Sequence, residues 1–328
     1  MGKIENRIII YFHLEKSKDH FIPGDRYLIP LLRNLIKKKK TSGIEKVFKN
    51  LCKSFDKLHV KYEINIPFER LTIKDQVIVL GGPKVLEHYH QSNKIVAGIA
   101  LMTHPSEWPD LFEQYPVATY LQHSPWTVSL YNRWYGAGKC KSWPSGIDTA
   151  FWKPSSGASK RLLVYVKFLW DKTENEEILL KPILNQLDQK GIDYHLIRYG
   201  QYDIKTYQKQ LSNSYGMIFL CEHESQGLAY QEAMAMNVPI LAWDQGFWLD
   251  PHRLAWGETE AVPASSVPYF DEHCGEKFKD LDEFKEKLPL FMNGVSNDKY
   301  APRNYILKHL SLERSAERIL EILNEVYS

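Results

Sequence analysis

The sequence predicts an α/β protein made of two consecutive Rossmann-like domains. Its 328 residues exceed what one ordinary hydrophobic core holds and suit two α/β domains. Short β-branched runs alternate with segments of helical spacing, which is typical of parallel sheets with crossover helices. The alternation stops at a segment rich in Pro, Gly and Ser, 142–158, and then starts again. We therefore expect two halves that face each other across a cleft, with ligands at the carboxyl ends of the strands.

The first half of the chain predicts a parallel sheet. Apolar or β-branched runs indicate strands at 7–14, 62–66, 76–80, 94–102 and 117–121. Residues 43–58 carry apolar side chains, among them Val47, Leu51 and Phe55, with the spacing of one helix face. We assign residues 1–150 to the N-terminal domain.

The same pattern restarts in the second half. Strands are expected at 161–166, 194–199, 216–221 and 238–243, and helices at 176–189, 204–211 and 227–236. An amphipathic helix is expected over 312–327. We assign residues 151–305 to a C-terminal Rossmann-like domain and residues 306–328 to a terminal helix.

The composition is that of a soluble globular protein, with 44% hydrophobic and 25% charged residues. A formal net charge of +2 argues against a nucleic-acid partner. No apolar stretch approaches the ~20 residues that span a bilayer and no leader peptide is recognisable, so we expect a cytoplasmic protein. The four cysteines form no CxxC pair, which argues against a zinc site or a disulfide framework.

The run Lys37–Lys40 is the one local excess of charge. Its lysines are either solvated side chains or a patch that attracts anionic lipid headgroups or a phosphorylated acceptor. The second alternative predicts peripheral contact with a membrane.

The segment 224–232 carries the strongest functional signal. Glu224 follows an expected strand, whose carbonyl end delivers the carboxylate into the cleft. Gly227 removes side-chain bulk where backbone N–H groups approach phosphate oxygens, at the N-terminus of an expected helix. Glu232 lies about one turn further along, where it can accept hydrogen bonds from ribose hydroxyls. Two carboxylates that flank a phosphate-binding turn would hold both ends of a sugar nucleotide.

This segment resembles the E-x7-E motif of the family-4 glycosyltransferases, which have the GT-B fold. The motif has a glycine three residues after the first glutamate and Glu-Ala-Met after the turn, which match Gly227 and Glu232-Ala233-Met234. The resemblance implies a retaining glycosyltransferase in which Glu224 holds a hydroxyl of the donor sugar and Glu232 holds ribose. Further donor-binding residues implied by the motif are Gly227, Ser225 and Leu228.

A pair of lysines lies at the first strand of the second half. Lys167 ends this strand and Lys172 follows five residues later. The family has Gly-Arg-x4-Lys here, so Val166 replaces the glycine and Lys167 the arginine. The resemblance implies that both lysines stabilise the departing diphosphate and so act in catalysis. A lysine lacks the bidentate fork of arginine, which predicts a looser hold on phosphate. Two solvated lysines are the alternative.

His104 follows the strand expected at 94–102. Family members carry a cleft histidine at the end of this strand, so the resemblance implies that His104 positions the transferred sugar. A structural role where the strand meets a loop is the alternative. The competing histidines are His88, His90 and His123.

The N-terminal half and the linker match the family less closely. Ser42-Gly43-Ile44-Glu45 resembles a Gly-Gly-x-Glu turn whose backbone approaches the donor phosphate, which makes Gly43 a donor-binding candidate. The turn Pro23-Gly24-Asp25 is the alternative. The insertion before Gly43 is longer than in the family, and its role is open. Residues 143–154 resemble the interdomain stretch, and 311–327 resembles the helix that crosses back to the N-terminal domain.

The resemblance implies a metal-independent hexosyltransferase whose N-terminal domain binds the acceptor and whose C-terminal domain binds a UDP- or GDP-sugar. No metal or other cofactor is expected, because Lys167 and Lys172 take the place of a cation. The one Asp-x-Asp, Asp280-Leu281-Asp282, follows no strand and is expected to start a helix. Neither a Gly-x-Gly-x-x-Gly after a strand nor a serine nucleophile elbow is present.

Alternatives remain open for the activity and the acceptor. Lys167 in place of arginine and the missing first glycine motivate a catalytically idle, sugar-nucleotide-binding partner subunit; a sugar-nucleotide epimerase is a further alternative. The resemblance implies that the acceptor is a hydroxyl of a glycan, lipid-linked or glycoprotein acceptor. Four aromatic residues either line an acceptor groove or pack in the core: Trp108, Trp126, Trp134 and Tyr135.

Overall fold

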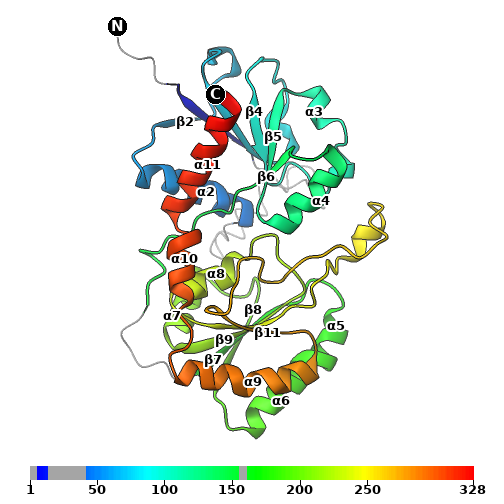
Figure 1. The fold of residues 1–328 in the computed structure, drawn as a ribbon, viewed down its shortest axis with the longest axis vertical. Coiled ribbons are helices and arrows are strands. Elements are labelled where there is room, and N and C mark those ends of the chain that lie inside the picture. The colour runs from blue at the N-terminus through cyan, green and yellow to red at the C-terminus, as the bar shows by residue number, and fades with distance from the viewer. Residues whose placement is uncertain (1–5, 14–41, 155–160) are drawn as a thin grey trace, which may run out of the picture.

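The computed structural model describes residues 6–13, 42–154 and 161–328. These residues form two α/β domains, one above the other in Figure 1. Three features of the sequence lie outside the described residues: the run Lys37–Lys40, the turn Pro23-Gly24-Asp25 and nearly all of the insertion between the first strand and Gly43.

The N-terminal domain contains a six-stranded parallel sheet in the order β2-β1-β3-β4-β5-β6. Its strands are β1 (Ile8–His13), β2 (Tyr62–Ile64), β3 (Gln76–Gly81), β4 (Ile95–Gly98), β5 (Val117–Gln122) and β6 (Cys140–Ser142). Alternate residues of a strand point to opposite faces, so Ile78 and Leu80 join one buried cluster while Val77 and Val79 join another. The sheet is therefore buried on both faces, as is usual for parallel sheets.

Helices from both ends of the sequence cover this sheet. Helix α2 (Gly43–Lys57) packs beside α11 (Leu312–Tyr327) on one face, where both contribute to the cluster that contains Ile78 (Figure 1). Residues of α3 (Leu111–Gln114) and α4 (Pro125–Tyr135) belong to the cluster on the other face. The terminal helix thus returns to the N-terminal domain, as the resemblance implied.

The C-terminal domain contains a five-stranded parallel sheet in the order β11-β10-β9-β7-β8. Its strands are β7 (Arg161–Lys167), β8 (Tyr194–Arg198), β9 (Ser214–Cys221), β10 (Ile240–Trp243) and β11 (Gly275–Phe278). One face is covered by α7 (Ile204–Ser212), α8 (Leu228–Ala235) and α10 (Pro302–His309), and the other by α6 (Lys181–Gln189) and α9 (Leu281–Ser296). Short α5 (Lys172–Asn175) follows β7.

This architecture confirms the predicted α/β fold, but some elements differ from the expected bounds. β4 ends at Gly98 because Ile99 and Ala100 have φ angles of 42° and 72°, which are incompatible with a strand. The helix expected at 176–189 begins with a π-helical turn, Glu176–Leu180, beside Pro182. Proline has no N–H for the regular helical bond, which accounts for the irregular turn there. Strands β6 and β11 and helices α4 and α10 were not predicted.

A long connection between β10 and β11 reaches the N-terminal domain, and we call residues 246–263 the arm (yellow in Figure 1). Phe247 pairs antiparallel with Pro263, and the backbone N–H of Trp248 donates to the carbonyl of Val262 at 2.8 Å. Trp248 and Val262 are buried in the N-terminal cluster that also contains Tyr131. The arm thus belongs to the C-terminal domain by sequence and to the N-terminal domain by packing.

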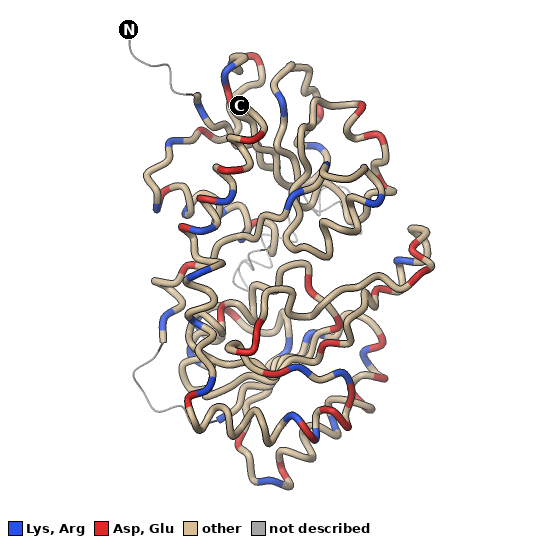
Figure 2. Tube along the Cα trace, in the orientation of Figure 1, with Lys and Arg blue, Asp and Glu red and all other residues tan. Residues whose placement is uncertain are grey.

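Charged residues of both signs are interspersed over the two domains (Figure 2). On α9, for example, Lys285 pairs with Asp282 at 2.7 Å. No helix in the described part of the chain is long and apolar enough to cross a bilayer.

We expect Ile322→Ala in α11 to destabilise the protein by about 2–5 kcal/mol, because it leaves a cavity in the core between α11 and the N-terminal sheet. Urea unfolding would measure the loss. The matched control is Asn324→Ala, two residues further along on the exposed side of α11. Equal stabilities of the two variants would contradict the docking of α11.

Candidate active site at the domain interface

Strand β9, a polar turn and α8 carry the acidic residues singled out from the sequence. β9 ends at Cys221, and Glu222, His223 and Glu224 follow at the carboxyl edge of the sheet. Gly227 caps α8 with a φ of 84°, and a Cβ atom at this position would clash with the ring of Tyr230. Only glycine fits this turn without strain, so Gly227 allows the chain to reverse between Glu224 and α8.

Lys167 and Glu224 form an ion pair, with 2.6 Å between Nζ and Oε1. The pair forms because β7 and β9 are neighbours, with Lys167 opposite Cys221. Burial acts to lower the pKa of Lys167, but the carboxylate of Glu224 outweighs it and raises this pKa above its ordinary value. The Nζ atom of Lys167 also lies 4.9 Å from the ring centroid of Tyr199. A cation and a carboxylate are thus held together at the edge of the C-terminal sheet.

Glu232 of α8 is buried, and its carboxylate pairs with Lys46 of α2 across the domain interface. Burial raises the pKa of Glu232, and Lys46 acts against that rise. Lys46 was not singled out from the sequence. The sequence feature that could have identified Lys46 is its position three residues after Gly43, because this spacing puts both residues on one side of α2.

The remaining donor-binding candidates lie on neighbouring segments. Lys172 is exposed at the start of α5, Ser225 is exposed in the turn, and Leu228 is half-buried against the core. Gly43 begins α2, where the Ser42 hydroxyl accepts a hydrogen bond from the Glu45 N–H at 3.2 Å. A Cβ atom at Gly43 would meet nothing within 4 Å, so packing does not require glycine there.

Glu222 fixes the loop that joins Lys167 to Lys172. Its Oε1 accepts hydrogen bonds from the backbone N–H groups of Leu169 and Trp170 at 2.9 and 3.1 Å. Its Oε2 is buried and has no hydrogen-bond partner among the described residues. Burial raises the pKa of Glu222, while backbone donors act to lower it.

His104 lies inside an aromatic cluster that the arm closes. Its ring is fully buried; Nδ1 accepts from the Ser106 N–H at 3.2 Å, which leaves Nε2 to donate to Glu258 at 3.3 Å. Trp256 of the arm stacks on the ring at 5.2 Å, and Trp134 meets it edge-on at 5.1 Å. Burial lowers the pKa of His104, while Glu258 acts to raise it. The histidine expected to position the sugar is therefore covered in this structure.

Glu258 of the arm binds side chains of the N-terminal domain. Its Oε2 pairs with Arg133 at 2.7 Å, and its Oε1 accepts from Trp134 Nε1 at 2.8 Å as well as from His104. Burial acts to raise the pKa of Glu258, but these partners outweigh it and hold this pKa below its ordinary value. The arm is thus attached to the other domain by a hydrogen-bonded ion pair.

The four aromatic residues considered for an acceptor groove divide between the interface and the core. Trp126 Nε1 donates to the carbonyl oxygen of Glu224 at 2.9 Å, which joins α4 to the turn after β9. Trp134 contacts Glu258. Trp108 and Tyr135 pack against the N-terminal core, and the Tyr135 hydroxyl donates to the Trp108 carbonyl at 2.8 Å.

The Asp-x-Asp segment starts α9, as predicted. Asp280 Oδ1 accepts from the backbone N–H groups of Asp282 and Glu283 at 3.0 and 2.9 Å. In the part of the chain that the structure describes, no group of three or more His, Cys, Asp or Glu side chains is arranged to hold a metal ion. The four cysteines all lie in that part and are free thiols.

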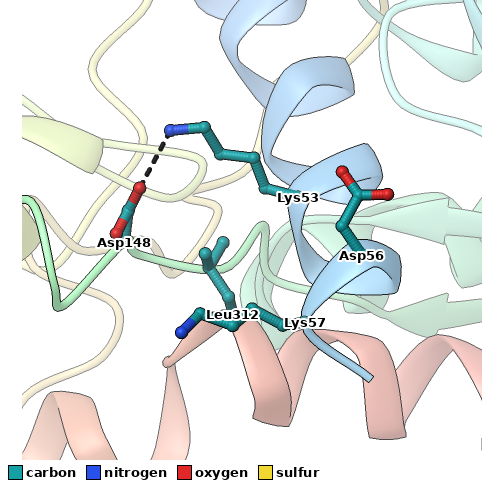
Figure 3. A pocket seen from close by; sticks show the side chains of 5 residues that line it. All are labelled: Lys53, Asp56, Lys57, Asp148 and Leu312. Atoms are coloured by element: carbon teal, nitrogen blue, oxygen red, sulfur yellow. Dashed lines mark hydrogen bonds and ion pairs between the residues drawn. The ribbon is translucent and has the colours of Figure 1, made fainter. Parts of the chain in front are cut away.

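Two shallow pockets lie away from the predicted site residues. The first, of about 290 Å³, lies between α2, the linker and α11, and Figure 3 shows Lys53 reaching across it to Asp148 at 2.9 Å. The second, of about 270 Å³, is lined by Tyr11, Asn65 and Lys84, among others, near the carboxyl end of β1. Neither pocket is lined by Lys167, Glu224 or Glu232. The candidate site is therefore identified from the chemistry of its side chains and not from a pocket.

We expect Glu258→Ala to loosen the arm, because Arg133 and His104 lose their acceptor. Loss of a hydrogen bond to a charged group costs about 1.5–3 kcal/mol. Hydrogen exchange at the amides of Trp248 and Ala264 should therefore accelerate by about ten- to hundredfold. Glu260→Ala, an exposed change in the same arm, is the control. Unchanged exchange in the first variant would show that other contacts hold the arm.

His123, a competing histidine, is buried after β5, while His88 and His90 are exposed. Burial lowers the pKa of His123 to about 4. An unfolded histidine has a pKa near 6.5, so between pH 6.5 and 4 the unfolded chain binds a proton that the folded chain does not. Stability is therefore lost as pH falls through this window. In urea unfolding, His123→Gln should reduce the loss between pH 7 and pH 5 by about 2 kcal/mol. The same pH dependence in both proteins would contradict a neutral, buried His123.

No protein-family model and no curated protein matches the sequence. Solved structures match the fold. TarM is 14% identical with a TM-score of 0.51, over 85% of this chain and 58% of TarM, so the chain spans little more than half of that protein. Sucrose-phosphate synthase from Thermosynechococcus elongatus is 12% identical with a TM-score of 0.51, over 98% of this chain and 99% of that one. The lipopolysaccharide outer core galactosyltransferase WaaB is 11% identical with a TM-score of 0.53, over 97% and 99%. Together with its two facing Rossmann-like domains, these likenesses show that the chain has the GT-B fold.

Proposed function

We propose that the chain is a retaining, metal-independent glycosyltransferase. It would transfer a hexose-type sugar from a nucleotide-diphosphate sugar to a hydroxyl of a glycan, lipid or protein-linked acceptor. The observation that carries the proposal is the Lys167–Glu224 pair, at the carboxyl edge of a parallel sheet and just before the glycine-capped start of α8. Ligands of open α/β sheets bind at this edge, and the GT-B fold and the E-x7-E resemblance support the same site.

The donor would be held by charge and by the helix start. Its diphosphate would lie against Lys167, Lys172 and the N-terminus of α8, where backbone N–H groups point outward. Lys167 would then bind phosphate oxygens as well as Glu224. The Glu224 carboxylate would keep acceptor capacity for a hydrogen bond from a sugar hydroxyl. Glu232 would accept from ribose hydroxyls while it keeps Lys46 beside it.

The reaction would proceed by attack on the face that the leaving group occupies. The acceptor oxygen forms a bond to the anomeric carbon as the bond from that carbon to the phosphate oxygen breaks. The leaving phosphate oxygen takes the proton of the acceptor hydroxyl. Lys167 and Lys172 stabilise the charge that develops on the diphosphate, which is the part that a metal ion plays in other transferases.

Contacts between the domains support the exclusion of water from this reaction. Trp126 of the N-terminal domain bonds to the turn that carries Glu224, and the arm bonds to α4 through Glu258. A closed site of this kind limits hydrolysis of the donor before the acceptor arrives.

The comparisons give an order in which to test donors. A structure of S. aureus TarM, 14% identical with a TM-score of 0.50, was determined in complex with UDP. UDP-sugars therefore come first and GDP-sugars second. A cytoplasmic location, with membrane contact through Lys37–Lys40, completes the proposal.

We expect one donor from a panel of UDP-, GDP-, ADP- and TDP-linked glucose, galactose, mannose and their N-acetyl derivatives to stabilise the protein and to be slowly hydrolysed in excess EDTA. Glu224→Ala and Lys167→Ala should each reduce kcat/KM for hydrolysis about 10²–10³-fold, since each removes a group that would stabilise the transition state. Lys209→Ala, on the exposed side of α7, is the matched control.

Other outcomes of this screen would favour other functions. A donor that stabilises the protein but is neither hydrolysed nor transferred would favour the idle, sugar-nucleotide-binding partner subunit. An altered sugar nucleotide without release of the nucleoside diphosphate would indicate an epimerase. Activity lost with EDTA and restored by a divalent cation would overturn metal independence.

A further inference from the structure

We infer that His223 binds the sugar ring of the donor, through a hydrogen bond between its imidazole and a sugar hydroxyl; the inference rests on the proposed function. His223 directly precedes Glu224 in the turn after β9 and was not singled out from the sequence. It shares that turn with the carboxylate that pairs with Lys167. His104, the histidine expected to perform this task, is covered by the arm.

Tryptophan rings hold the imidazole of His223 in place. Trp170 stacks on it, with 5.0 Å between centroids and 10° between planes. Trp126 and Trp248 meet it edge-on at 5.8 and 6.3 Å. These three rings come from the loop after β7, from α4 and from the arm. His223 is therefore fixed where the Lys167–Lys172 loop, the N-terminal domain and the arm meet.

The two imidazole nitrogens of His223 have no hydrogen-bond partner within the described chain. The residue is 9% exposed, Nδ1 is buried without a hydrogen-bond partner, and none of the described residues bonds to Nε2. An unpaired buried polar group costs about 1–3 kcal/mol, so such groups are normally satisfied. His104 in contrast has both nitrogens paired. A rigid imidazole with free capacity beside Glu224 is suited to a ligand that supplies the missing partner.

The surroundings of His223 favour a neutral ligand group. Burial lowers the pKa of His223 to about 4; Asp250 acts to raise it and Lys167 to lower it. The ring is therefore uncharged at neutral pH and is a weaker partner for phosphate than Lys167. A neutral imidazole both donates to and accepts from hydroxyls, and tryptophan rings offer apolar surface to the C–H groups of a sugar. The lysines would thus hold the diphosphate and His223 the sugar.

The test compares two ligands on three variants. Calorimetry would measure the affinity of the tightest donor of the panel above and of the free nucleoside diphosphate with the same base. His223→Ala should weaken the nucleotide-sugar about two- to thirteenfold, the value of one hydrogen bond, and leave the nucleoside diphosphate unchanged. His223→Gln, which keeps a hydrogen-bonding group, should restore part of the loss. His90→Gln, a change at an exposed histidine, is the matched control and should leave the ratio of the two affinities unchanged.

A measurement on the wild-type protein keeps the inference testable if His223→Ala does not fold. In ¹⁵N spectra of the histidine side chains, the His223 signals should shift when the nucleotide-sugar is added and not when the nucleoside diphosphate is added. Equal loss of affinity for both ligands, or no loss, would overturn the sugar-binding role of His223 and leave the proposed function standing. Absence of binding by any nucleotide in the wild-type protein would overturn the proposed function itself.

Discussion

A carboxylate that is removed from water needs a cation or several hydrogen-bond donors beside it, and this requirement determines how the two domains meet. Glu232 lies in the C-terminal domain and its cation, Lys46, in the N-terminal domain. Glu258 belongs to the C-terminal sequence, and it pairs with Arg133 of the N-terminal domain. Separating the domains would leave both acids without their partners. The observed arrangement is therefore held by charge as well as by apolar packing.

The same requirement distinguishes the two histidines of the interface. The Nε2 atom of His104 is hydrogen-bonded to Glu258, and the tryptophans of the arm cover the ring. His223 has tryptophans around it but no carboxylate bonded to it in the described chain, so its nitrogens remain available. In this structure the arm covers the imidazole of His104, while the imidazole of His223 has no hydrogen-bond partner among the described residues. Strand order alone points to His104, and no local sequence pattern shows that the arm covers its ring.

Local patterns predicted most of the fold and part of the site. Most of the strands, α2, α8, α11 and the reversal at Gly227 depend on periodicity and backbone freedom that a short window contains. The carboxyl-edge position of Lys167 and Glu224 follows from the ends of two such strands. The Lys46–Glu232 pair joins residues 186 apart, and no window contains both. The arm has no regular period, because its conformation is set by contacts with the other domain. Those contacts, and so the covering of His104, had to be seen in three dimensions.

The N-terminal domain cannot complete its hydrophobic core until α11 has been synthesised, although its first strand is made long before. Ile8 and Ile10 of β1 share a buried cluster with Ile319 and Ile322 of α11. A ribosome makes β1 among the first strands and α11 after every other element described. The face of the first sheet that α11 covers therefore stays open to water, or to a chaperone, until α11 has been made. A premature stop just before residue 312 would leave every residue of that sheet intact and still expose its core.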